Sequence, residues 1–172
     1  MQERHAREQY FFDRRTVSHL ANFASRFDLP CCLCAPMVGE ALGAMGVRAR
    51  VLDVDERFAH VAGFRPYDVY RPAETGEKYG LVLVDPPFTI VSLSQLFRAV
   101  KSIARNDVRQ PLLVAYPASR AANLLATFAP FGLGPTGYRP GYVSVQTLAE
   151  DPIEFFGNLT PEQNEALASA GP

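Results

Sequence analysis

The chain has 172 residues, of which 48% are hydrophobic and 20% are charged, and its formal net charge is −1. This length and composition are typical of one soluble folded domain, and they exclude a disordered or fibrous chain. The near-neutral charge argues against a strongly basic groove that would grip nucleic acid by its phosphates alone. We therefore expect residues 1–172 to form a single domain.

The same features bear on compartment and metal content. No apolar run approaches the roughly 20 residues that a membrane-spanning helix needs, and the first nine residues show no signal-peptide pattern. We expect an intracellular, cytoplasmic protein with no membrane association. Cys31, Cys32 and Cys34 lie close together without histidines in ligand spacing, which favours buried thiols over a metal site.

In chain order, the first half of the sequence alternates helix and strand patterns. Asp13 can cap a helix that carries Val17, Leu20 and Ala21 on its buried side and stops before Pro30. We then expect a strand at 31–34, a helix at 38–45, a strand at 48–53 and a weaker strand at 63–68. This alternation predicts an α/β layered fold.

The second half continues the alternation. Residues 81–84 are a fourth strand, and Ser92 can cap a helix that runs to residue 103. A fifth strand at 111–116 and a helix at 119–129 follow, and 141–145 and 153–156 are expected as edge strands close enough to be antiparallel. The residues after them, ending at Pro172, are predicted to be a loose polar tail.

The most informative stretch is residues 81–88, LVLVDPPF. Its apolar run is typical of a parallel strand that is buried on both faces, and two prolines force the chain to leave the sheet at the strand's carboxyl end. Ligands of open α/β sheets bind at that edge. Asp85, Pro86 and Phe88 therefore become candidate site residues, the alternative being a plain Pro-Pro turn in which Asp85 caps a neighbour.

These residue types suit the binding of a planar amine. If the Asp85 carboxylate and the Pro86 carbonyl accept the two hydrogens of an adenine amine, the nitrogen can pyramidalise and direct its lone pair at a methyl donor. Phe88 can stack on the base, a contact worth roughly 1–3 kcal/mol.

Other carboxylates and a loop are candidates for holding that donor. Asp53 and Asp55 follow the second strand, where nucleotide-binding folds contact ribose hydroxyls, and Asp68 follows the third strand, where it could accept from an adenine amine. A glycine-rich loop should follow the first strand, but Ala35 and Pro36 stand in its place and no G-x-G occurs.

Four segments, in order, resemble the N6-adenine-methyltransferase-like family, which includes the elongation factor 1A lysine methyltransferase and the zinc-finger CCHC ribosomal RNA adenine methyltransferase. They are QYFFD at 9–13, CAP at 34–36, LDVDERF at 52–58 and DPPF at 85–88. The resemblance implies a Rossmann-like class I methyltransferase fold of about seven strands, with helices on both faces and the last strand antiparallel. It also implies N-methylation with S-adenosylmethionine as cofactor, and it makes the missing G-x-G a family trait.

By the same resemblance, Asp85, Pro86 and Phe88 hold the acceptor. The implied cofactor-binding residues are Gln9, Tyr10, Phe11, Phe12, Ala35, Pro36, Asp53 and Asp55; Asp68 is a candidate only from its place after the third strand, the alternative being a plain turn.

The acceptor stays open between adenine N6 in RNA or DNA, favoured by the motif, and a protein lysine, favoured by the neutral charge. A third interpretation is a catalytically silent, cofactor-binding scaffold. Because the chain carries no zinc finger or basic extension, a partner protein could supply substrate recognition; Tyr138 and Arg139 are further candidates for substrate contact.

Overall fold

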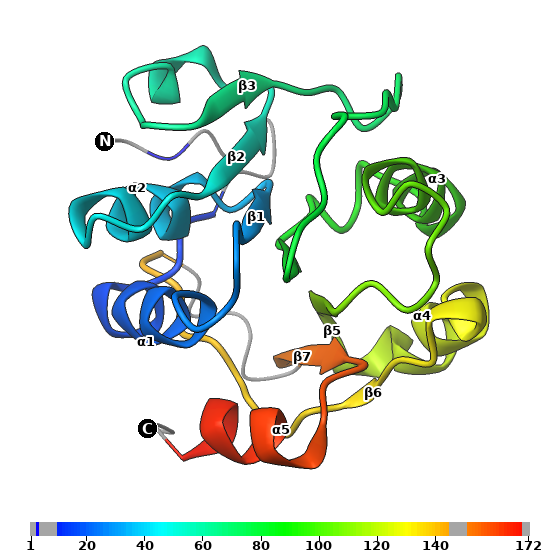
Figure 1. Ribbon diagram of the computed structural model, residues 1–172. Helices are drawn as coiled ribbons and strands as arrows, with labels where there is room; N and C mark the ends of the chain where they lie inside the picture. Colours follow the sequence, from blue (N-terminus) through cyan, green and yellow to red (C-terminus); the bar gives the residue numbers. More distant parts are fainter. Residues whose placement is uncertain (1–2, 4–9, 145–150, 170–172) are drawn as a thin grey trace.

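The structure, a computed structural model, describes residues 3, 10–144 and 151–169. Within these residues seven strands form one sheet in the order β3-β2-β1-β4-β5-β7-β6 (Figure 1). Strands β1 to β5 are parallel, and β7 is antiparallel to both of its neighbours. The strands are β1 Cys31–Leu33, β2 Arg50–Asp53, β3 Phe64–Pro66, β4 Val82–Val84, β5 Leu112–Pro117, β6 Gly134–Pro135 and β7 Ile153–Gly157.

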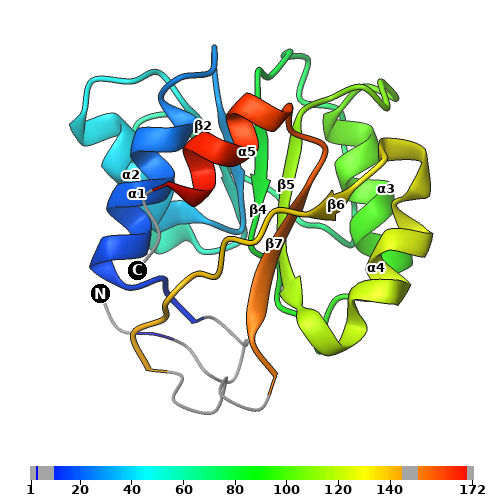
Figure 2. The ribbon, with the colours of Figure 1, turned by 90° about the horizontal axis from the view of Figure 1, so that it is seen from below.

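Helices cover both faces of this sheet. Helices α1, α2 and α5 lie on one face and α3 and α4 on the other (Figures 1 and 2). The expected Rossmann-like layering with an antiparallel last strand is therefore confirmed. The α-helices are α1 Arg14–Ala24, α2 Pro36–Ala44, α3 Leu93–Ile103, α4 Ala121–Thr127 and α5 Pro161–Ala168; the 3-10 turns are η2 Glu56–Phe58, η3 Ala118–Arg120 and η4 Ala129–Phe131.

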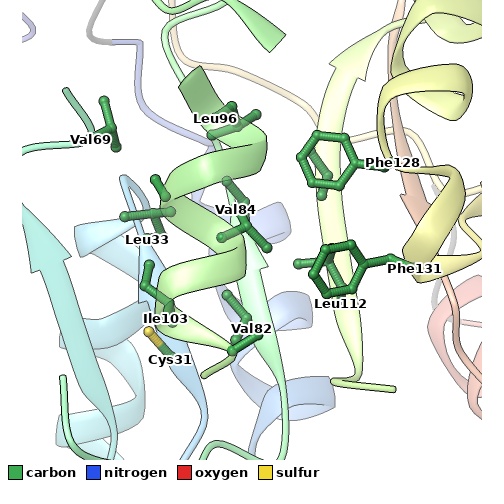
Figure 3. Packing of buried hydrophobic residues seen from close by; sticks show 14 of the residues in the cluster. Cys31, Leu33, Val69, Val82, Val84, Leu96, Ile103, Leu112, Phe128 and Phe131 are labelled. Carbon is green, nitrogen blue, oxygen red and sulfur yellow. The ribbon is translucent and has the colours of Figure 1, made fainter. Parts of the chain in front are cut away.

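The central strands are buried on both faces because each apolar residue in turn points to a different helical layer. On β4, Val82 and Val84 face α3 and α4, whereas Leu83 faces α1 and α2. Figure 3 shows the first of these layers, in which strand side chains pack against Leu96 and Phe128. Cys31 and Cys32 are fully buried on opposite faces, as predicted for core thiols.

Local signals place the helix starts. Asp13 Oδ1 accepts the Thr16 N–H at 2.7 Å, and Ser92 Oγ accepts the Gln95 N–H at 3.2 Å, so both expected caps are confirmed. Pro36 occupies the first turn of α2, where a missing N–H costs nothing. Among the described residues, no helix is long and apolar enough to cross a bilayer.

Two expectations for the last third of the chain were wrong. Residues 141–144 form no sheet strand; Tyr142 makes a single antiparallel bridge with Phe12, and residue 145 lies outside the described part. The strand that pairs with β7 is the short β6, and β7 is an interior strand rather than an edge. The tail is not loose throughout, because Thr160 and Gln163 form a reciprocal capping box that starts α5.

Candidate functional site

Three strand ends meet at the carboxyl edge of the sheet and line one cleft. Because β1, β2 and β4 are parallel neighbours, the residues that follow or end them lie side by side: Cys34, Asp53 and Asp85. The cleft holds about 610 Å³ of empty space, which includes the open solvent at its mouth. Its lining residues are Tyr10, Phe11, Cys34, Pro36, Asp53, Val54, Asp55, Asp85, Pro86, Pro87, Phe88 and Tyr142.

Asp85 lies at the point where β4 leaves the sheet. Its N–H still donates to the Leu33 carbonyl at 3.1 Å, so the backbone is held in register with β1 up to this residue. Its carboxylate oxygen Oδ1 accepts a hydrogen bond from the Tyr142 hydroxyl at 2.9 Å. The residue is half-buried and lines the cleft, and loss of hydration raises its pKa to about 8, with the Asp53 charge adding to the rise.

The Phe88 loop is held against the end of β5. The Phe88 ring packs edge-to-face on Tyr116, with ring centroids 5.7 Å apart. Arg120 Nη1 donates to the Phe88 carbonyl at 3.2 Å, and the Arg120 guanidinium lies 5.2 Å from the centre of the Tyr116 ring. These contacts fix the aromatic wall of the cleft next to Asp85.

Two acids form the opposite wall, after β2. Asp53 Oδ1 accepts the Asp55 N–H at 2.8 Å, while the Asp55 carboxylate pairs with Arg57 Nη2 at 2.6 Å. Burial raises the Asp53 pKa to about 6. Both acids are buried and line the cleft, so their carboxylates form one polar wall of it.

In the loop after β1, a cysteine adopts the left-handed backbone conformation that a glycine would normally provide. Cys34 has φ 57°, the left-handed region that usually requires glycine. This bend turns the chain from β1 into Ala35 and the start of α2. Unlike Cys31 and Cys32, Cys34 is not a core thiol but lines the cleft.

The remaining predicted cofactor residues divide into three groups. Tyr10, Phe11 and Pro36 line the cleft. Phe12 and Ala35 are buried behind it, and Phe12 packs on Tyr142 with ring centroids 5.0 Å apart. Asp68 is not among the lining residues; its Oδ1 accepts the Tyr70 N–H at 2.9 Å in a local turn. Gln9 lies outside the described residues.

Sequence reasoning missed Tyr142. The residue reaches Asp85 because Gly141 and Val143 pair with the segment before α1: the Asp13 N–H donates to the Gly141 carbonyl at 2.8 Å and the Val143 N–H to the Phe11 carbonyl at 3.0 Å. No local pattern indicates a pairing between such distant segments.

Comparison with known proteins identifies the family. Residues 3–155 match the family described as "Probable N6-adenine methyltransferase". The chain belongs to this family. No curated protein matches the sequence. This methyltransferase also shares its fold with solved structures of low sequence identity.

Three of these structures illustrate the likeness. A TehB-like SAM-dependent methyltransferase from Corynebacterium glutamicum has a TM-score of 0.57 at 10% identity, over 86% of this chain and 89% of the other. NodS, an N-methyltransferase from Bradyrhizobium japonicum solved with S-adenosyl-L-homocysteine, has a TM-score of 0.53 at 15% identity, over 86% of this chain and 87% of NodS. A chain of the Mtq2–Trm112 complex from E. cuniculi has a TM-score of 0.51 at 12% identity, over 88% of this chain and 99% of the other. The fold is that of class I methyltransferases.

Family and fold together identify an S-adenosylmethionine-dependent methyltransferase, and the cleft fits this cofactor in kind. Asp53 and Asp55 line the cleft after β2, where nucleotide-binding folds contact ribose hydroxyls, the left-handed Cys34 turns the chain from β1 into α2 at the cleft, and Tyr10 and Phe11 offer apolar walls. When bound, the cofactor supplies an electrophilic methyl group.

Proposed function

We propose that this methyltransferase transfers the methyl group to the N6 amine of adenine in RNA or DNA. The observation that carries the proposal is the presence of Asp85, Pro86 and Phe88 in one cleft with the acids after β2. The Asp85 carboxylate and the Pro86 carbonyl accept the two amine hydrogens, and the Phe88 ring stacks on the base. Within the described chain no hydrogen bond uses the Pro86 carbonyl, whereas the Pro87 carbonyl accepts the Val91 N–H at 3.0 Å.

The acid–base character of Asp85 fits this acceptor. An N-methylated amine must lose one proton, and a carboxylate whose pKa is raised to about 8 is a better base than an ordinary one. Amine hydrogens donated to Asp85 favour its charged form, so substrate binding itself promotes ionisation. The neutral adenine amine needs no prior deprotonation.

A protein lysine is the alternative acceptor. A lysine amine is cationic until it loses a proton, and an ionised Asp85 beside it would favour the cation, which has no lone pair to share. The net charge of −1 favours the alternative, since the chain has no overall excess of basic residues to bind phosphates. In the fold neighbour Mtq2–Trm112, a two-protein complex methylates the termination factor eRF1; a recognition partner for this chain is compatible with either acceptor.

Labelling separates the two acceptors. The protein is incubated with radiolabelled S-adenosylmethionine and a lysate of cells that lack its gene, and the products are split for nuclease and protease treatment. We expect nuclease-sensitive label that co-migrates with N6-methyladenosine after digestion, and none with Asp85→Ala. Protease-sensitive label would replace adenine by lysine as the acceptor, and absence of label from both fractions would support the silent scaffold.

A further inference from the structure

We propose that Tyr142 is a positioning residue of the acceptor site: its hydroxyl holds Asp85 Oδ1 and leaves Oδ2 for the acceptor amine. The inference rests on the acceptor role proposed for Asp85. It adds a residue that lies outside the Asp-Pro-Pro-Phe motif and far from it in sequence.

The geometry restricts the carboxylate at one oxygen. The 2.9 Å bond from the Tyr142 hydroxyl is the one side-chain hydrogen bond that Asp85 makes within the described chain. Both residues line the cleft. A carboxyl group tied at Oδ1 cannot rotate without breaking this bond, so Oδ2 keeps a constant direction.

The Tyr142 ring is itself fixed by the first turn of α1 and the segment before it. The Thr16 hydroxyl accepts the Gly141 N–H at 2.8 Å, and the Phe12 ring packs on the Tyr142 ring. Two backbone hydrogen bonds flank Tyr142, one between Asp13 and Gly141 and one between Val143 and Phe11. Together, these contacts hold Tyr142 in place beside Asp85. Phe12, expected to contact the cofactor, has this supporting position in the structure.

The hydrogen bond from Tyr142 also affects the pH at which Asp85 ionises. The groups that act on the Asp85 carboxylate are Asp53, at the end of β2, and Tyr142. The Cys34 thiol lies near Asp53 and Asp85, and it stays protonated because burial and these two acids raise the pKa of Cys34. Burial and Asp53 raise the Asp85 pKa, and the Tyr142 hydroxyl lowers it because it donates to the charged form. Tyr142→Phe removes the lowering contribution alone, and the ring remains in place.

The test titrates Asp85 directly. Protein labelled with carbon-13 at the aspartate carboxyl is titrated by NMR, with the Asp85 signal assigned from its absence in Asp85→Asn. A hydrogen bond to a charged group contributes about 1.5–3 kcal/mol, so we expect Tyr142→Phe to raise the midpoint by roughly 1–2 pH units.

Tyr79→Phe is the matched control. The Tyr79 hydroxyl donates to the Glu77 carboxylate at 3.1 Å, and Tyr79 precedes β4, at the opposite edge of the sheet from the cleft. Loss of this hydroxyl should leave the Asp85 midpoint unchanged. An equal midpoint in Tyr142→Phe and wild type would overturn the proposal.

Methyl transfer to RNA from cells that lack the gene gives the second readout. We expect the pH–rate profile of Tyr142→Phe to move upward with the NMR midpoint, and its rate at neutral pH to fall about tenfold or more. If the wild type methylates this RNA and Tyr142→Phe keeps its rate and profile, the positioning role is wrong while the proposed function stands. If the midpoint shifts but no preparation methylates RNA, DNA or protein from these cells, the acceptor role fails for both residues.

Discussion

Tyr142 and Asp85 are 57 positions apart in the chain, yet the Tyr142 hydroxyl lies 2.9 Å from Asp85 Oδ1. One hydrogen bond does not offset the loss of hydration at this carboxylate, whose pKa is raised to about 8. The folded protein therefore holds the Asp85 proton more tightly than the unfolded chain does, at an ordinary pKa near 3.9. The consequence is a stability cost that grows with pH between these two pKa values, where Asp85 is ionised in the unfolded chain and still protonated in the folded protein.

Asp85→Asn should thus stabilise the fold in a pH-dependent way. The folded-state pKa lies above the unfolded value, so the wild type loses stability as pH rises from about 4 to about 8. Asparagine carries no charge and can still accept the Tyr142 hydrogen. We expect the gain in unfolding free energy from urea denaturation to be larger at pH 8.5 than at pH 5, reaching roughly 1–3 kcal/mol.

Asp107→Asn provides the opposite case. Asp107 pairs with Arg109, which lowers its pKa, so its loss removes a stabilising charge above the unfolded pKa. If Asp85→Asn shows the same difference from wild type at both pH values, the buried-acid account of Asp85 is wrong.

Gly39 fixes the distance between α2 and the sheet. A Cβ built at Gly39 would come within 2.1 Å of Val51 Cγ2 on β2, so Gly39→Ala forces α2 away from the strand. We expect thermal or urea unfolding to show a loss of roughly 1–3 kcal/mol.

Gly43 is the matched control, because it lies in the same helix and a Cβ there meets nothing within 4 Å. Gly43→Ala should stabilise the protein by about 0.5–1 kcal/mol through helix propensity. Equal effects at Gly39 and Gly43 would exclude close helix–strand contact as the reason for glycine at position 39.

Variants at Cys34 test whether this residue has the left-handed conformation expected of a glycine in the loop after β1. Its φ of 57° disfavours any residue with a Cβ, so Cys34→Gly should be more stable than Cys34→Ala by about 1 kcal/mol, the reverse of the order in a helix. Both variants lose the same thiol, which makes the comparison internal. An alanine variant as stable as the glycine variant would contradict the left-handed conformation.

Much of the layout could be predicted because local patterns carry it. The apolar run of β4 and the prolines after it place Asp85 at the carboxyl edge of the sheet, and Asp13 and Ser92 mark two helix starts. The capping box at Thr160 was an available signal that the loose-tail prediction overlooked.

Other parts depend on contacts between distant segments. The position of Tyr142 follows from pairing with the residues before α1, and residue patterns within 141–145 are equally compatible with an edge strand. Cys34 carries no sequence mark of its left-handed backbone, since cysteine rarely adopts it. Asp68 shows the converse limit: its place after the third strand suggested a ligand contact, whereas its side chain closes a local turn.

The central claim is that Asp85 holds the acceptor amine and is not needed to bind the cofactor. It is tested most directly by measuring, for wild type and Asp85→Ala, S-adenosylmethionine affinity by calorimetry and methyl transfer to RNA from cells lacking the gene. We predict cofactor affinity within about twofold of wild type and a transfer rate lower by roughly 10²–10⁴-fold. An Asp85→Ala variant that transfers methyl groups at the wild-type rate would contradict the account.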